Sequence, residues 1–139
     1  MNFRIYDVNV NRLNESLRVI EDIARFEFND KDLTLIVKKI RHELKNKLQR
    51  ENIRNKLIEA RDTSKDTAKY LNPEEEFKRG SIDDVVTANL KRIQESSRVM
   101  EEMCKIAHQS LSRFFKKIRF QFYKIEKEIY KKYFQKDRG

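Results

Sequence analysis

Apolar residues recur every three or four positions along most of the chain, which is the spacing that places them on one face of a helix. A first apolar stripe follows residues 10–24, and Asp7 or Asn9 is a candidate for the cap that begins its helix. The polar break at 29–32 supplies a new cap and separates this stripe from a second one over 33–48. The pattern therefore predicts two helices joined by a short turn.

A second pair of helices is predicted between residues 81 and 136. Ser81, followed by Asp83 and Asp84, is typical of a helix start, and this helix is expected to continue past Met103. After a break near 108–112, the last helix carries a broad apolar and aromatic stripe. Its members are Phe115, Ile118, Phe122, Ile125 and Ile129, with Phe114, Tyr123, Tyr130 and Tyr133 beside them.

The two pairs are copies of one motif. Residues 9–21 (NVNRLNESLRVIE) align with residues 89–101 (NLKRIQESSRVME), and seven of these thirteen positions are identical. Residues 37–41 (VKKIR) also match residues 115–119 (FKKIR) after the offset changes by two. We therefore predict an all-α, four-helix-bundle-like fold of two duplicated antiparallel helix pairs in a single domain, 1–139. The two units span about 5–50 and 81–136.

The connection between the units, residues 51–80, contains the only proline, Pro73, and one of the two glycines, Gly80. We expect a short helix over 52–60, a polar turn over 61–67 and a further helix start at 72–76. A connection of this length in a compact domain is usually either functional or disordered. We favour a functional role.

Composition narrows the possible chemistry. Charged residues make up 40% of the chain and the formal net charge is +9, but two glycines cannot build a Walker loop or a dinucleotide-binding fingerprint. Any phosphate must therefore be bound mainly by arginine. The lone Cys104 excludes an internal disulfide and fits a reducing compartment. With no signal-like N-terminus and no apolar run long enough to span a bilayer, we expect a cytoplasmic protein without a membrane partner.

Each repeat places an asparagine and an arginine within the apolar arc of its first helix. These residues are Asn9, Arg12, Asn89 and Arg92. A buried arginine needs a carboxylate, backbone carbonyls or a ligand anion, and Glu15 and Glu95 lie one turn away as candidate partners. The pattern is consistent both with a structural ion-pair network and with a ligand site.

The segment 61–67 (RDTSKDT) combines a guanidinium, hydroxyls and two carboxylates. Such a set suits a phosphate held by Arg and Lys, with Mg²⁺ between phosphate oxygens and Asp. An exposed turn with solvated charges is the alternative interpretation of the same residues.

The C-terminal residues 112–139 interleave many lysines and arginines with Phe and Tyr. A nucleic-acid-binding helix shows this composition, and so does a core helix with a lysine-rich solvent face. The heptad spacing of the aromatic residues favours the core helix, so nucleic acid is not the expected partner. Cys104 lies on the apolar arc of its helix, where a packing role is expected.

Several segments together resemble a known family. They are residues 7–26 (DVNVNRLNESLRVIEDIARF), 40–44 (IRHEL), 60–63 (ARDT) with Asp66, 88–95 (ANLKRIQE) and 98–102 (RVMEE). They resemble the small helical domain that is often fused in front of thiamine-phosphate synthase and that also exists alone. The chain departs from that pattern at Lys65 and Thr67, near which small residues including glycine are expected.

The resemblance implies a hydroxymethylpyrimidine-phosphate kinase limited to the second phosphorylation. Such an enzyme transfers the γ-phosphoryl group of ATP, with Mg²⁺, to 4-amino-5-hydroxymethyl-2-methylpyrimidine phosphate and forms the diphosphate used in thiamine biosynthesis. Thiamine-phosphate synthase, as a separate protein, is then the expected partner, and a homodimer stays open. A basic helical nucleic-acid-binding protein and a non-catalytic partner of a thiamine-synthesis enzyme are the alternatives.

Joining the resemblance with the charge pattern gives a hypothesis for each candidate residue. Asn9 and Asn89 are expected to orient the pyrimidine or its hydroxymethyl group, and Asp62 and Asp66 to hold Mg²⁺. The expected phosphate contacts are Arg12, Arg18, Arg61, Thr63, Lys65, Arg92 and Arg98. The candidates for catalysis are Arg61, Asp62, Glu15 and Glu95, of which the three carboxylates are possible bases.

Overall fold

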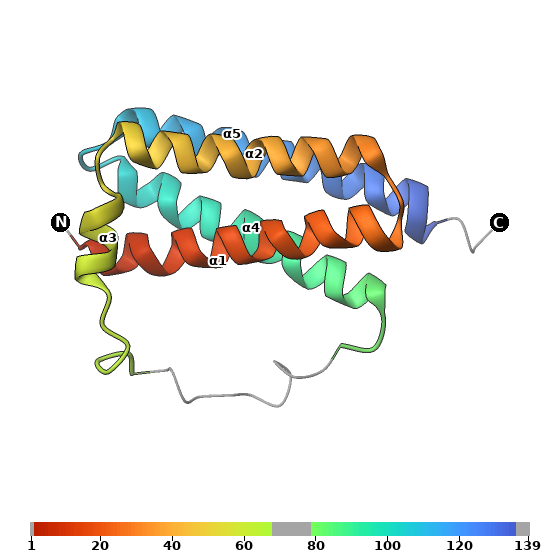
Figure 1. Cartoon of the computed structure of the whole chain (residues 1–139), viewed down its shortest axis with the longest axis horizontal. Helices are drawn as coiled ribbons and strands as arrows, with labels where there is room; N and C mark the ends of the chain where they lie inside the picture. Colours follow the sequence, from red (N-terminus) through yellow and green to blue (C-terminus); the bar gives the residue numbers. More distant parts are fainter. Residues whose placement is uncertain (1, 68–78, 136–139) are drawn as a thin grey trace.

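The structure is a computed structural model that describes residues 2–67 and 79–135 (Figure 1). Five α-helices form these parts of the chain, and no strand occurs in them. The helices are α1 (Phe3–Asp22), α2 (Lys31–Arg50), α3 (Arg54–Ala60), α4 (Ile82–Cys104) and α5 (Gln109–Ile129). A π-helical turn extends α1 over Ile23–Glu27, and another extends α5 over Tyr130–Phe134. The predicted all-α fold is confirmed; the helix start predicted at 72–76 lies outside the described residues.

The predicted start of the first helix is wrong. Asn2 caps α1, its side chain accepting a hydrogen bond from the amide of Arg4, so Asp7 and Asn9 lie inside the helix, both buried. Tertiary contact explains the earlier start, because Tyr6 is fully buried and its hydroxyl donates to the carbonyl of Met103 at 3.1 Å. This anchor stabilises a turn that the apolar stripe alone does not reveal.

The other predicted helix boundaries agree more closely with the structure. Asp30 caps α2 and Ser81 caps α4, each through a side-chain hydrogen bond to a first-turn amide. The break before α5 covers residues 105–108, slightly earlier than predicted, and His108 makes no side-chain capping bond. The short helix expected over 52–60 is α3.

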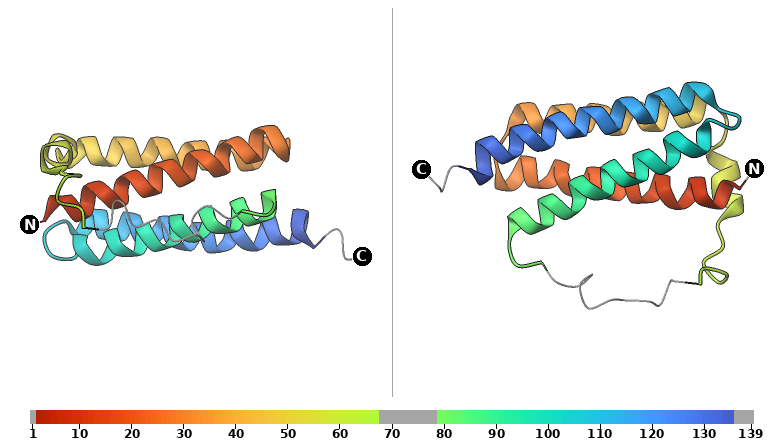
Figure 2. Two further views of the ribbon diagram at one scale, coloured as in Figure 1. Left: turned by 90° about the horizontal axis from the view of Figure 1, so that it is seen from below. Right: turned by 180° about the vertical axis from the view of Figure 1, so that it is seen from behind.

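The helices pack as two antiparallel hairpins, α1 with α2 and α4 with α5 (Figure 2). The main contact between the hairpins is made by α1 and α4, which cross obliquely, while α3 packs against α1 at one end of the bundle (Figure 1). One apolar core runs through all five helices. Phe115, Phe122 and Ile129 of α5 are buried in it, which confirms the core-helix interpretation of this lysine-rich segment. No helix in the described part of the chain is long and apolar enough to cross a bilayer.

Candidate functional site

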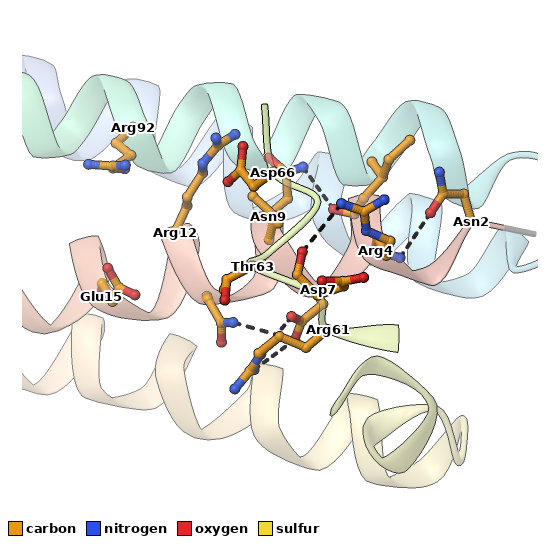
Figure 3. A pocket seen from close by; sticks show the side chains of 14 residues that line it. Asn2, Arg4, Asp7, Asn9, Arg12, Glu15, Arg61, Thr63, Asp66 and Arg92 are labelled. Carbon is orange, nitrogen blue, oxygen red and sulfur yellow. Dashed lines mark hydrogen bonds and ion pairs between the residues drawn. The ribbon is translucent and has the colours of Figure 1, made fainter. Parts of the chain in front are cut away.

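A solvent-open groove lies between α1, α4 and the loop that follows α3 (Figure 3). Its volume is about 640 Å³, within the range of small-molecule sites. It brings together candidate residues from both repeats and from the connection. Those residues are Asn9, Arg12, Glu15, Arg61, Asp62, Thr63, Asp66 and Arg92. A smaller hollow of about 360 Å³ adjoins it along α4 and is lined by Glu95 as well.

Arg61 is fixed at the rim of the groove by a bidentate ion pair with Asp7. Its Nε and Nη2 donate to the two carboxylate oxygens of Asp7, both at 2.8 Å. The hydrogen bonds from Arg61 to Asp7, together with the negative charge of Asp7, raise the pKa of Arg61 above its ordinary value. The Asp7 side chain is only 5% exposed and the Arg61 side chain is 46% exposed, so the buried partner belongs to α1 and the exposed partner belongs to the loop. The pair therefore ties the loop 61–67 to the first repeat.

Asp62 orders the loop itself. Its Oδ1 accepts hydrogen bonds from the amide and hydroxyl of Ser64, at 3.1 and 2.6 Å, and from the amide of Lys65 at 3.2 Å. The hydrogen bond from the Ser64 hydroxyl is the main cause that lowers the pKa of Asp62, although desolvation opposes it. The carboxylate is therefore ionised at neutral pH, and its Oδ2 lies 3.8 Å from Lys65 Nζ.

Magnesium would need oxygen atoms from a ligand in addition to those of this loop. No group of three or more His, Cys, Asp or Glu residues in the described part of the chain could hold a metal ion. Mg²⁺ in phosphoryl-transfer sites is commonly held by one or two carboxylates together with phosphate oxygens. The Asp62 and Asp66 carboxylates, both lining the groove, fit that donor set.

The prediction that Arg12 and Arg92 point into the core is wrong. Both side chains are exposed and line the groove, and neither pairs with Glu15, Glu95 or any other described carboxylate. α1 and α4 cross obliquely (Figure 1), and the exposed side chains of Arg12 and Arg92 line the groove at this crossing. Two guanidinium groups that have no carboxylate partner among the described residues, one from each repeat, therefore lie in the same groove, as Figure 3 shows.

Each of the two asparagines donates a hydrogen bond to the backbone carbonyl four residues before it, but the two differ in their position relative to the groove. Nδ2 of Asn9 donates to the carbonyl of Ile5 at 2.9 Å, and Nδ2 of Asn89 donates to that of Val85 at 2.8 Å. Asn9 lines the groove, whereas Asn89 does not. The buried Oδ1 of Asn9 has no hydrogen-bond partner within the described residues.

Arg18 and Arg98, predicted to contact phosphates, lie outside the groove. Each is paired with a buried glutamate of its own helix, Arg18 with Glu21 at 3.3 Å and Arg98 with Glu101 at 3.6 Å. Lys65 also lies outside the lining of the groove, whereas Thr63 is part of it. The structure therefore groups Arg12, Arg61 and Arg92 and leaves the other predicted cations elsewhere.

The model of the ThiD2 family matches residues 4–128 of this sequence. The chain belongs to the ThiD2 family. A protein of Nostoc punctiforme named thiamine-phosphate synthase is 36% identical over 127 residues, which cover 91% of this chain and 35% of that protein. A protein of the same name from Rhodopirellula baltica is 36% identical over 126 residues, 91% of this chain and 33% of that protein.

This ThiD2 chain spans about a third of the length of the curated relatives it matches. No solved structure matches it. The matched region includes α1, α4 and the loop 61–67, so every residue of the groove except Asn2 lies within the ThiD2 match.

Sequence reasoning missed Asp7 as a site residue of this ThiD2 chain. It was considered only as a helix cap, yet it carries the bidentate contact to Arg61. A signal was present: Asp7 lies three residues before Val10 and so shares the apolar stripe of α1. A carboxylate on such a stripe needs a cation, and Arg61 is that cation.

Proposed function

We propose that this chain transfers the γ-phosphoryl group of ATP to 4-amino-5-hydroxymethyl-2-methylpyrimidine phosphate and forms the diphosphate for thiamine biosynthesis. The proposal is supported by membership in the ThiD2 family and by relatives named thiamine-phosphate synthase. The observation that carries it is the groove, where Arg12 and Arg92 have no described carboxylate partner beside the loop of Arg61. A thiamine-phosphate synthase would use the product.

The reaction places modest demands on the protein. An oxygen of the acceptor phosphate attacks the γ-phosphorus, an O–P bond forms, and the bond from the γ-phosphorus to the β,γ-bridging oxygen breaks, so that ADP leaves with the electron pair. Because the second pKa of a phosphate monoester is about 6, the attacking oxygen is mostly deprotonated at neutral pH. Glu15 or Glu95 would accept a proton only from the monoprotonated form. Positioning and charge neutralisation are then the main tasks of the site.

Charge neutralisation falls to the arginines of the groove. The two substrates together carry about five negative charges at neutral pH. Arg12 and Arg92 have their guanidinium groups available, and Arg61 can exchange an Asp7 oxygen for a phosphate oxygen. Mg²⁺, held by phosphate oxygens with Asp62 and Asp66, would reduce the repulsion between the two anions.

Selectivity for the phosphorylated acceptor also follows from the arginines of the groove. An arginine dedicated to the acceptor phosphate loses its ionic partner when the free alcohol binds, so the free alcohol lacks a contact that the phosphorylated acceptor makes. The kinase is therefore expected to act on the monophosphate and not on 4-amino-5-hydroxymethyl-2-methylpyrimidine itself.

A kinase assay tests the function directly. Protein, ATP and Mg²⁺ are incubated with the pyrimidine phosphate or with the free alcohol, and products are identified by mass spectrometry beside a coupled assay for ADP. Diphosphate formed only from the phosphate is the expected result. Arg61→Ala should lose most of the activity, whereas Arg113→Ala, an exposed arginine of α5 outside the groove, should keep it. Absence of product with folded wild-type protein would reject the kinase and make a salt-dependent nucleic-acid titration the next measurement.

A further inference from the structure

The groove has two lobes that share three residues. The wide lobe, about 640 Å³, lies toward the loop 61–67, and the narrow lobe, about 360 Å³, runs along α4. Asn9, Arg12 and Arg92 line both lobes and therefore mark their junction. Figure 3 shows Arg12 reaching from α1 toward α4, with Arg92 farther along the same groove.

The lobes differ in size and in chemistry. The wide lobe is lined by the carboxylates of Asp62 and Asp66 and by the guanidinium of Arg61, which together suit a triphosphate with its magnesium ion. The narrow lobe has about half the volume and is lined by Lys91, Glu95 and Val99, so it suits a small phosphorylated ring. A nucleoside triphosphate is the larger of the two substrates and matches the wide lobe.

The junction is the place where the two repeats meet. Arg12 and Arg92 occupy equivalent positions in the repeats, so the duplication supplies two guanidinium groups from opposite sides. Asn9 adds a second, independent observation: it is 4% exposed, lines both lobes, and its Oδ1 has no hydrogen-bond partner within the described residues. The amino group of the acceptor and the methylene that carries its phosphate are on adjacent ring carbons, so a hydrogen-bond acceptor beside two arginines matches this pair.

We propose that the groove binds the two substrates end to end, with the nucleotide in the wide lobe and the pyrimidine phosphate in the narrow lobe. This assignment rests on the proposed kinase function. The γ-phosphoryl group then passes between the substrates at the junction, where Arg12 and Arg92 neutralise it. The acceptor phosphate oxygen forms the new bond to the γ-phosphorus, and ADP leaves toward the loop 61–67. Neither repeat alone forms the reaction centre.

Two exposed valines allow each lobe to be blocked separately. Val8 lines the wide lobe and is 40% exposed, and Val99 lines the narrow lobe and is 37% exposed. Val8→Trp and Val99→Trp fill one lobe each without a change of charge, and circular dichroism checks that both variants fold. Calorimetry then measures the binding of Mg²⁺–ADP and of the pyrimidine phosphate to each protein.

The expected result is a crossed pattern. Val8→Trp should weaken Mg²⁺–ADP by about tenfold or more and leave the pyrimidine phosphate within about twofold, and Val99→Trp should do the reverse. The opposite pattern would overturn the assignment of the lobes. Equal weakening of both ligands by each variant would overturn the two-lobe arrangement in favour of one shared site.

The junction makes a different prediction. Arg12→Gln and Arg92→Gln should each lower kcat by about a hundredfold, a larger change than in either binding constant, because these arginines contact the acceptor phosphate at the point where the γ-phosphoryl group is transferred. A loss in binding of only one ligand, with kcat unchanged, would place that arginine in a lobe and overturn its junction role.

These experiments distinguish failure of the proposed kinase function from failure of the proposed lobe assignment. Wild-type protein that binds both ligands but forms no diphosphate rejects the proposed reaction, and the crossed pattern still tests the two sites. Wild-type protein that binds neither ligand rejects both. Formation of the diphosphate without the crossed binding pattern rejects the assignment of the two lobes but not the kinase function.

Discussion

The first and second repeats have the same internal ion cluster, but the first repeat also holds the loop 61–67, through the ion pair of Asp7 with Arg61. Glu21 is buried between Arg18 and Arg41 in the first repeat, and Glu101 is buried between Arg98 and Arg119 in the second. In each case one arginine comes from the same helix and the other from the antiparallel helix of the hairpin. The cluster therefore joins the two helices of each hairpin.

The difference lies two residues before the repeated segment. Asp7 of the first repeat binds Arg61, whereas the equivalent position of the second repeat is Thr87, an exposed residue outside the groove. Duplication thus supplied two similar hairpins, and one carboxylate makes them chemically unequal. The ion cluster that both repeats share joins the helices of each hairpin, and the carboxylate that only the first repeat has at this position brings the loop to the groove.

The largest effect is expected where the repeats differ. Asp7→Thr makes the first repeat like the second, releases Arg61, and should lower kcat/KM of the pyrimidine-phosphate kinase reaction by about 10²–10³-fold, because the loop loses its position. Thr87→Asp is the matched control and should leave the rate unchanged. Steady-state kinetics checks both, and full activity of Asp7→Thr would show that docking of Arg61 is not required.

The two ion clusters, around Glu21 and around Glu101, should contribute differently to the free energy of unfolding. Arg119 is 12% exposed and Arg41 is 27% exposed, so loss of the glutamate charge leaves the more deeply buried cation in the second repeat. Glu101→Gln is expected to lower the free energy of unfolding by about 3 kcal/mol and Glu21→Gln by about 1–2 kcal/mol. Urea denaturation measures both values, and a larger loss for Glu21→Gln would contradict the burial argument.

The N-terminal caps of α2 and α5, the second helices of the two hairpins, also differ, and the expected effect on stability is smaller. Asp30 caps α2 through the amide of Leu33, whereas His108, at the equivalent position before α5, makes no capping bond. Asp30→Ala should cost about 1–2 kcal/mol and His108→Asp should stabilise by up to about 1 kcal/mol. Thermal unfolding compares the two variants. If His108→Asp destabilises, the contact of the His108 ring with Tyr6 matters more than the cap.

The charge of Asp30 gives a pH-dependent prediction. Burial disfavours its ionised form, but hydrogen bonds from Tyr133, the Leu33 amide and Lys132 together lower its pKa below the ordinary value. A lowered pKa contributes stability that is present above the unfolded pKa of about 4 and is lost as the pH falls through the folded pKa. Asn keeps the cap but not the charge. Asp30→Asn should therefore cost about 1 kcal/mol at pH 7 and nothing near pH 2, as urea titrations at both pH values would measure.

The smallest effect is expected at Cys104, which is equivalent to the buried Ala24 of the first repeat. Burial, with a contribution from Glu51, raises the pKa of the Cys104 thiol to about 11, so the thiol stays protonated at neutral pH. It should react with a thiol reagent at pH 8 only after unfolding. Cys104→Ala makes the repeats alike and should cost no more than about 1 kcal/mol in chemical denaturation. Rapid labelling of the native protein would contradict this placement.

Much of the fold could be predicted because helical periodicity and caps are local. The apolar stripes predict α2, α4 and α5, the structure confirms the predicted cap Ser81, and Asp30 is the residue of the polar break 29–32 that caps α2. The site was harder to predict. Glu15 and Glu95 are the predicted partners of Arg12 and Arg92 because they are one turn away, but the buried glutamates that bind arginine are Glu21 and Glu101. Their main partners lie 20 and 18 residues away, on the neighbouring helix of each hairpin.

The sequence by itself determined the helices, the duplication and the set of charged side chains from which the groove is built. Hydrogen bonds within a helix join residues four apart, so this information is contained in short segments. The tertiary structure decided which charges are paired and which remain available. Asp7 and Arg61 are separated by 54 residues, and the exposure of Arg12 and Arg92 depends on the crossing of α1 and α4. Ion pairing depends on distance in space, and only the packing of the two hairpins sets those distances.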